Sequence, residues 1–212
     1  MVWLDLGSAQ QRDAFQEVLV QKNYPLERIS FVPDLVVDCG ANVGFFTSKV
    51  AVCYPQAEII AFEAQNENYA FLAKQPALQM PNVQLIHAAV SNRNGVGLFI
   101  GEGVGGRLDS NYTVTEARNV RVTDLGEWWS RKKRPRVLWK IDVEGHENIL
   151  IPHLSGSWYG PCAVFLETHA SEGGDKKIMD VLKKEGFMIS LLNEHRLCGD
   201  ERVFREYLCL LA

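Results

Sequence analysis

The sequence lacks the features that mark a secreted, membrane-spanning or disulfide-bonded protein. Its 212 residues contain five cysteines, and no two of them stand at a C-x-x-C spacing. An odd number of unpatterned cysteines is typical of reduced, buried thiols. The first residues, MVWLDLG, offer neither the basic nor the apolar region of a signal peptide. No run approaches the roughly 18 apolar residues of a membrane span. We therefore expect a cytoplasmic protein without a membrane span.

The chain also lacks an excess of positive charge. It has 22 lysines and arginines against 26 aspartates and glutamates, a net charge of −4. Such a chain has no general attraction to nucleic acid or to an anionic membrane. One local run, RKKRPR at 131–136, is basic. We interpret it as a solvated loop, although it could bind phosphates or an anionic substrate. A non-catalytic RNA- or anion-binding module therefore stays an alternative.

Two nucleotide-binding motifs are absent. The P-loop pattern does not occur, and the glycines at 101–106 are not followed by Lys-Ser or Lys-Thr. In the turn GANVG, Asn42 stands where the dinucleotide fingerprint requires its middle glycine, so a pyrophosphate would meet a side chain. A nicotinamide-dependent oxidoreductase on a Rossmann sheet is thus a disfavoured alternative.

Strands and helices are expected to alternate along the chain. Apolar runs bounded by turn residues predict parallel strands over 35–39, 58–63, 83–90, 137–142 and 163–167. Helical spacing predicts helices over 8–22, 45–54, 66–74, 123–129 and 176–184, and a helix from 147 that Pro152 restricts. Residues 187–192 and 203–211 predict a closing antiparallel pair. This order indicates an α/β three-layer sandwich with a seven-stranded, mainly parallel sheet.

We expect one domain over residues 1–212. Residues 1–34 are expected to form an N-terminal helical cap, whose helix begins after Ser8. Residues 93–122, with turn residues and a glycine cluster, predict an insertion or lid of strands and loops.

The turn after the first strand is a candidate ligand site. Asp38 closes the strand, and Gly40, Asn42 and Gly44 fill the turn into the next helix. Glycines allow backbone to approach a ligand, and the helix start supplies N–H donors that suit a carboxylate. A strand-end acid such as Asp38 or Asp142 can attract an ammonium group.

A second acid stands at the end of the next strand. Glu63 follows Asp38 by 25 positions, where a carboxylate can accept hydrogen bonds from a ribose diol. The tip of the third strand, residues 87–89 around Ala88, is expected near the adenine. Diol, carboxylate and ammonium sites together predict an adenosyl–amino-acid ligand, S-adenosylmethionine.

A denser polar cluster follows the fourth and fifth strands. The segment KIDVEGHE at 140–147 contributes Asp142, Glu144 and His146, and FLETH at 165–169 contributes Glu167 and His169. Ligands of open α/β sheets bind at the carboxyl ends of strands, so these side chains are expected to converge near the first site. Three carboxylates beside two imidazoles are costly unless they are paired, protonated or metal-bound.

Three roles follow for this cluster. His146 is the predicted general base, its neighbouring acids orienting it and raising its pKa; His169 is the alternative base, and Asp142 belongs to the same catalytic group. Asp142, Glu144, Glu167 and His169 are candidate ligands for Mg²⁺ or Mn²⁺. A hydrogen-bonded network that holds two loops together is the structural alternative.

The quoted motifs resemble those of FkbM-type methyltransferases, from about Val36 to Leu210. The KIDVEGHE segment is the most specific of them, and Ala64 departs from the proline common after the strand-end Glu. The resemblance implies a class I methyltransferase fold, S-adenosylmethionine as cofactor and O-methylation of a hydroxyl on a sugar, glycolipid or secondary metabolite. The acceptor would then be a small molecule or a glycan rather than nucleic acid.

Overall fold

A seven-stranded sheet is the centre of the computed structural model, which describes residues 2, 5, 8–21, 23–101, 107–108, 118–132, 134–171, 174–195 and 202–212. Its strand order is β10-β11-β9-β8-β1-β2-β3. Among these strands, β11 alone runs opposite to the other six. The predicted sheet is therefore confirmed. Its strands are β1 (Leu35–Cys39), β2 (Glu58–Glu63), β3 (Val83–His87), β8 (Val137–Ile141), β9 (Cys162–Ser171), β10 (Met188–His195) and β11 (Arg202–Leu211).

The two central strands are buried along their whole length. Every residue of β1 and β8 is buried, which is why both read as unbroken apolar runs rather than alternating ones. Each carries one charged exception, and the two exceptions, Asp38 and Lys140, lie opposite each other in the register. A buried acid is thus placed beside a buried base by strand pairing alone.

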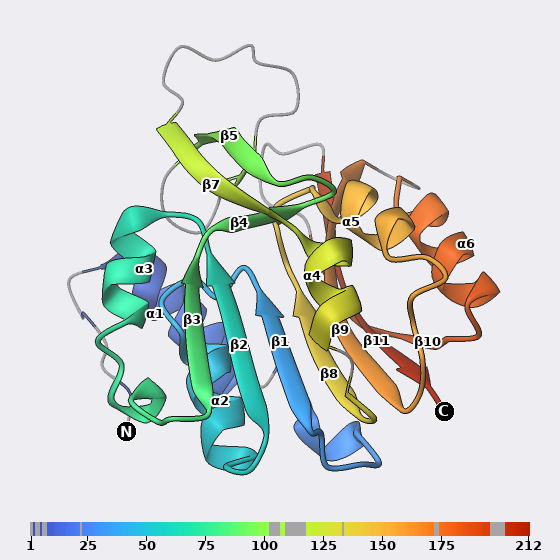
Figure 1. The fold of residues 1–212 in the computed structure, drawn as a ribbon, viewed down its shortest axis with the longest axis horizontal. Coiled ribbons are helices and arrows are strands. Elements are labelled where there is room, and N and C mark those ends of the chain that lie inside the picture. The colour runs from blue at the N-terminus through green and yellow to red at the C-terminus, as the bar shows by residue number, and fades with distance from the viewer. Residues whose placement is uncertain are drawn as a thin grey trace.

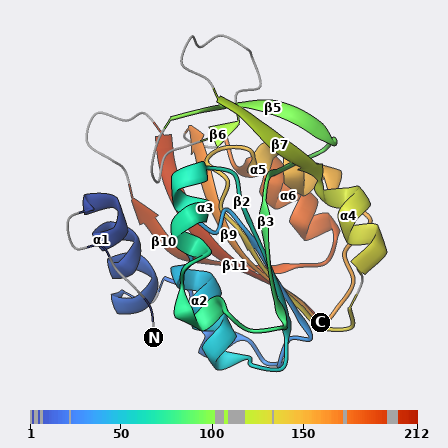
Figure 2. The same ribbon diagram turned by 60° about the vertical axis from the view of Figure 1, so that its left-hand side comes forward.

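Helices cover both faces of the main sheet, as predicted. One face carries α1 (Ala9–Phe15), α2 (Phe45–Cys53) and α3 (Asn66–Leu72), and the other carries α4 (Leu125–Lys132), α5 (Glu147–His153) and α6 (Lys176–Lys184) (Figure 2). The expected helix from Ser8 is capped by the Ser8 side chain, and after Phe15 it continues as a π-helical segment, Gln16–Val20. Two short 3₁₀ turns, Leu26–Arg28 and Pro76–Leu78, complete the helical elements of the described residues.

A second, four-stranded sheet lies over the carboxyl ends of the main strands (Figure 1). It has the order β4-β7-β5-β6, from β4 (Ala89–Ser91), β7 (Arg118–Asp124), β5 (Gly95–Ile100) and β6 (Arg107–Leu108). The prediction of one strand over 83–90 is thus wrong, because this segment forms β3 in the main sheet and the first part of β4 in the second sheet. The chain leaves the main sheet at Ala88, whose N–H donates to the Glu63 carbonyl, and continues in the second sheet. Residues 102–106 of the glycine cluster lie outside the described residues, and the lid stays a prediction.

Three further boundaries differ from the prediction. Thr123 belongs to β7 instead of opening a helix, because it pairs with Val90 of β4. Pro152 lies inside α5, near the end of that short helix. Strand β9 extends past Glu167 to Ser171, because β11 pairs with it along its full length. Among the described residues, no helix combines the length and apolar character needed to cross a membrane.

Candidate functional site

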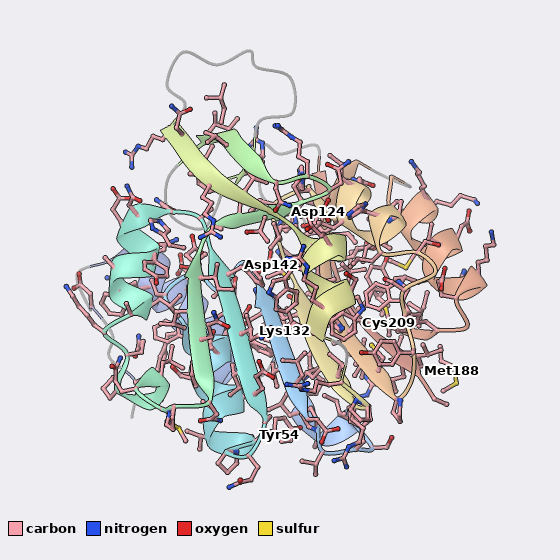
Figure 3. All side chains as sticks on the ribbon, viewed as in Figure 1. Tyr54, Asp124, Lys132, Asp142, Met188 and Cys209 are labelled. Carbon is pink, nitrogen blue, oxygen red and sulfur yellow. The ribbon has the colours of Figure 1, made fainter. Side chains whose placement is uncertain are left out.

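One pocket opens between the main sheet and the second sheet, with about 600 Å³ of empty space including its mouth. Five segments line it: the turn after β1, the end of β2 with the start of α3, the β3–β4 junction, strands β5 and β6, and the loop from β8 to α5. Figure 3 shows Asp142, a lining residue, at the upper end of the main sheet and Tyr54 at the opposite end. The pocket therefore lies where open α/β sheets bind ligands.

The turn after β1 owes its shape to left-handed backbone. Gly40 has φ 87°, Asn42 φ 52° and Gly44 φ 90°. A Cβ on Gly40 would lie 1.9 Å from the Asp142 carbonyl oxygen, and one on Gly44 would lie 2.5 Å from Leu72 Cδ1. Gly40 and Asn42 line the pocket, whereas Gly44 packs against α3 and does not. Gly44 therefore has a packing role in place of the predicted contact with the ligand.

The sequence predicts that the N–H groups of this turn are open to an anion, but four of them donate hydrogen bonds within the protein. Gly40 and Ala41 donate to the Phe62 carbonyl, and Gly44 donates to the Ala41 carbonyl. The N–H of Asn42 donates to Glu63 Oε2 at 2.7 Å. Four N–H groups of the turn are thus engaged within the protein, which fixes the turn against the end of β2.

Glu63 is a buried carboxylate on the pocket wall. It is 6% exposed, and besides Asn42 it accepts the N–H of Gln65 at 2.8 Å on Oε1. Burial raises its pKa, which these two hydrogen bonds counteract. A carboxylate has about four lone-pair positions, so two accepted bonds leave acceptor capacity on a group already held in place.

The wall beside Glu63 is small and apolar. Ala88, Ala89 and Val90 line the pocket. Ala88 therefore lies at the site, as the sequence predicts. His87 is not a lining residue: its ring stacks on Tyr69 with centroids 4.4 Å apart.

Across from that wall, the second sheet contributes residues that sequence reasoning missed. Phe99, Arg107 and Leu108 line the pocket from β5 and β6, where Phe99 pairs with Leu108. No motif marks them in the sequence. Only the fold of the insertion brings them over the site.

Asp38 lies behind the pocket and is not a lining residue. It is fully buried, accepts a hydrogen bond from Thr47 Oγ1 at 2.5 Å, and lies 3.7 Å from Lys140 Nζ. Lys140 donates to Asp142 Oδ2 at 3.0 Å and to the Gly40 carbonyl at 2.8 Å. Burial opposes the charge on Lys140, but Asp142 and Asp38 outweigh it and raise the lysine pKa. Asp38 therefore acts on the pocket through Lys140 and the turn.

His169 is surrounded by carboxylates. Its Nδ1 lies 3.3 Å from Glu147 Oε1, and its Nε2 lies 3.3 Å from Glu144, 3.5 Å from Glu167 and 3.9 Å from Asp142. Burial disfavours the charged ring, yet these acids, Glu147 foremost, raise the His169 pKa to about 10. A protonated imidazole has no lone pair to accept a proton, so this environment does not suit the predicted alternative base.

The predicted metal ligands converge, but the three carboxylates among them surround the fourth, the His169 side chain. Asp142, Glu144 and Glu167 all approach His169. Among the described residues, Asp142, His169 and Glu147 offer ligand atoms within 4.8 Å of one another. Glu147 Oε1 already accepts the N–H groups of Val143 and Gly145, and Asp142 is bound by Lys140. The donor set thus resembles a chain of ion pairs more than an open metal site.

Glu206 belongs to the same cluster and was missed by sequence reasoning. It lies opposite Glu167 in the β9–β11 register and accepts a hydrogen bond from Asn23 at 2.9 Å. Burial, Glu17 and Asp142 raise the Glu206 pKa to about 7, and burial foremost raises that of Glu167 well above its usual value. Alternation along β11 could not have revealed it, because the consecutive residues Glu206, Tyr207, Leu208 and Cys209 are all buried.

His146 lines the pocket at the start of α5. Its ring is buried, and Nε2 lies 2.8 Å from Ser91 Oγ of β4. Burial lowers the His146 pKa, so the expectation that acids raise it is wrong: the effect of Glu147 is smaller than that of burial. The ring is therefore neutral near pH 7, the form in which it can accept a proton.

The basic run lies at the other end of the sheet. The backbone of Arg136 accepts the N–H of Asp34, just before β1 begins, and their side chains form an ion pair at 2.7 Å. Lys132 and Arg134 both pair with Glu58, at 2.9 and 2.7 Å. Lys133 lies outside the described residues. These pairs place the run at the surface, remote from the pocket. The predicted loop is wrong in its extent, because Arg131 and Lys132 form the last turn of α4.

Comparison with known proteins agrees with this geometry. The family model described as methyltransferase FkbM domain matches residues 38–196. The fold is similar to that of precorrin-6y C5,15-methyltransferase from Geobacter metallireducens, with 14% identity, TM-score 0.50, and coverage of 88% of this chain and 86% of that one. It is also similar to a proposed RNA methyltransferase from Pyrococcus horikoshii, with 11% identity, TM-score 0.52, and coverage of 94% and 82%. No curated protein matches the sequence.

Proposed function

The chain belongs to the methyltransferase FkbM domain family, and from this premise we propose that it moves a methyl group from S-adenosylmethionine to a hydroxyl oxygen. The acceptor we propose is a sugar, glycolipid or secondary metabolite, as the family resemblance implies. The protein's task in such a transfer is to hold donor and acceptor in line and to remove the acceptor's proton.

The observation that carries the proposal is the chemical order along one pocket. At one end, Glu63 offers carboxylate oxygens to a ribose diol, beside the small apolar wall of Ala88 and Ala89. At the other end lie the Gly40 backbone and the carboxylate of Asp142, which suits an ammonium group. An adenosyl–amino-acid molecule presents the same chemistry in the same order.

The residues therefore fit S-adenosylmethionine, which when bound supplies an electrophilic methyl group next to a positively charged sulfur. The pocket can accept this positive charge because it has acids on its wall. Lys140 holds one oxygen of Asp142 and so keeps the carboxylate at the tip of β8, where burial alone would favour its neutral form. Lys140 and then His169 lower the Asp142 pKa, so it is ionised when the ligand arrives.

His146 is the residue that we propose as general base. It lines the pocket two positions beyond Glu144, is buried, and is neutral near pH 7. We propose no metal ion: Lys140 and His169 already supply positive charge to the acids at this edge.

Titration calorimetry with S-adenosylmethionine and with NAD tests the proposal. We expect S-adenosylmethionine alone to bind. Replacing Glu63 with alanine should weaken that binding by about 2 kcal/mol, because charge-assisted hydrogen bonds are lost. Glu58 is the matched control: it begins the same strand, pairs with Lys132 and Arg134 far from the pocket, and Glu58→Ala should bind normally. Equal affinity of the Glu63→Ala and Glu58→Ala proteins would contradict the ribose role.

A further inference from the structure

We propose that Ser91 is a positioning residue that sets the tautomer of His146, so that Nε2 carries the ring proton and Nδ1 is the atom that accepts the substrate's proton. The proposal rests on the proposed function for its chemical purpose. Its geometric basis is independent of the reaction, since it concerns one hydrogen bond between two buried side chains.

The contact joins two segments that are distant in the sequence. Ser91 ends β4 and is 4% exposed; His146 precedes α5 and is 8% exposed. Ser91 Oγ and His146 Nε2 lie 2.8 Å apart and 55 positions apart in the chain. The second sheet holds Ser91 in place, because Ser91 pairs with Asp124 of β7. The left-handed backbone of Glu144 and Gly145, with φ 55° and 99°, turns the chain into His146.

The direction of the hydrogen bond follows from the hydroxyl's single proton. Ser91 Oγ donates to Asn92 Oδ1 at 3.2 Å. A hydroxyl has one proton to give and two lone pairs, so toward His146 it acts as acceptor. Nε2 must then carry a hydrogen. Because a neutral imidazole has only one N–H, Nδ1 keeps its lone pair.

That lone pair belongs to a ring that lines the pocket. No described residue forms a hydrogen bond with His146 Nδ1, and the ring lines the pocket beside Val143 and Glu144. The charged groups that act on the ring are Glu147, which favours its protonated form, and Arg93, which with burial disfavours it. In the transfer, the acceptor's hydroxyl proton moves to Nδ1 while its oxygen bonds to the methyl carbon. The electrons of the broken C–S bond stay on sulfur, and the resulting imidazolium keeps its Nε2–H bond to Ser91.

Long-range ¹H–¹⁵N correlation spectra of the labelled full-length protein test the tautomer without any acceptor. We expect His146 near neutral pH to show a protonated Nε2 and an unprotonated Nδ1, its signals identified by their loss in His146→Gln. Ser91→Ala should give a mixture of tautomers, and Ser91→Thr should restore the wild-type pattern. Ser48→Ala, which also alters a buried serine, is the control and should change nothing.

A protonated Nδ1 in the wild type, or an unchanged tautomer in a folded Ser91→Ala, would overturn the proposal. The wild-type spectrum decides even if the variant fails to fold. With an acceptor in hand, Ser91→Ala should lower kcat about tenfold with unchanged affinity for S-adenosylmethionine, and Ser91→Thr should recover it. Failure of the proposed function is recognised separately, because calorimetry would then show no binding of S-adenosylmethionine while the wild-type tautomer remained as expected.

Discussion

Lys140 and His169 are the two cations among the acids of the site. Lys140 lies beside Asp38 of β1 and Asp142, which directly follows β8. His169 lies beside Glu144, Glu147 and Glu167, and also within 3.9 Å of Asp142. A buried charge is tolerated only when it is paired, so these cations allow carboxylates to gather at one sheet edge. His146 has the opposite environment, in which burial keeps the ring neutral. The two histidines of the site thus have different protonation states.

This difference predicts which histidine matters for chemistry. His146→Ala should reduce methyl transfer about a hundredfold while leaving calorimetric affinity for S-adenosylmethionine nearly unchanged, because general-base catalysis is lost and binding is not. His153→Ala, at the other end of the same helix and bound to Asp124, should keep its activity. A screen of hydroxyl acceptors with radiolabelled methyl donor supplies the assay. Full turnover in His146→Ala would refute the assignment.

Glu206 predicts a pH dependence of stability. Its pKa is raised from 4.5 to about 7, first by burial and then by Glu17 and Asp142, while Asn23 and Asn193 oppose the shift with hydrogen bonds. Glu167, its cross-strand partner, is half-buried. The folded protein therefore holds a proton that the unfolded chain releases. This contribution to stability is full below pH 4.5 and is lost as pH rises through about 7.

Glu206→Gln removes that loss, since an amide does not titrate. From about pH 5 to about pH 8, the free energy of unfolding of the wild type should fall by about 2 kcal/mol more than that of the variant, as measured by urea denaturation. Glu194→Gln is the control, because that exposed side chain pairs with Arg205 at the surface. Parallel pH profiles of Glu206→Gln and the wild type would show that Glu206 does not titrate in this range.

At the scale of elements, the tips of β1 and β8 touch through Gly40. A Cβ on Gly40 would lie 1.9 Å from the Asp142 carbonyl oxygen. No side-chain movement can relieve this clash, because the backbone fixes the position of the Cβ and the carbonyl oxygen is itself a backbone atom. Gly40→Ala should therefore destabilise the protein by more than about 2 kcal/mol and abolish binding of S-adenosylmethionine. Gly156→Ala is the matched control: it has φ 78° with nothing within 4 Å, and only the backbone cost of about 1 kcal/mol applies. Equal melting temperatures of the two variants would contradict this account.

The main elements could be predicted because their signals are local. The apolar run of β1, ending at Gly40, and the periodicity of α6 each indicate one structure. The errors arise where partners distant in the sequence decide the outcome. Residues 83–90 read as one strand, but the N–H of Ala88 bonds to the end of β2 and the chain then joins another sheet. Likewise His169 lies within β9 because β11 pairs with it there.

At the scale of the whole molecule, parallel strands explain why the site could be predicted in outline. Polar side chains at the carboxyl ends of parallel strands must meet at the same sheet edge, and Glu63, Asp142 and His169 do so. The sequence could not reveal how they share protons, because burial and pairing are three-dimensional. Nor could it reveal Phe99 and Leu108, which reach the pocket only through the second sheet.

The distribution of charge also predicts how the protein responds to metal removal. The acids at the sheet edge are neutralised by Lys140 and His169, both buried and both fixed by several contacts. Methyl transfer should therefore persist in full after EDTA treatment, with no gain from added Mg²⁺ or Mn²⁺. Loss of activity that returns with either metal would show that Asp142, Glu144, Glu167 and His169 act as ligands after all.

The central claim is that S-adenosylmethionine binds in the pocket between Glu63 and Asp142, beneath the second sheet. A crystal structure of the protein with S-adenosylhomocysteine, the product that this reaction leaves, tests it most directly. We predict ribose hydroxyls within hydrogen-bond distance of the Glu63 carboxylate, adenine beside Ala88, and the amino-acid end near Gly40 and Asp142. A product molecule bound elsewhere, or with its ribose away from Glu63, would contradict the account.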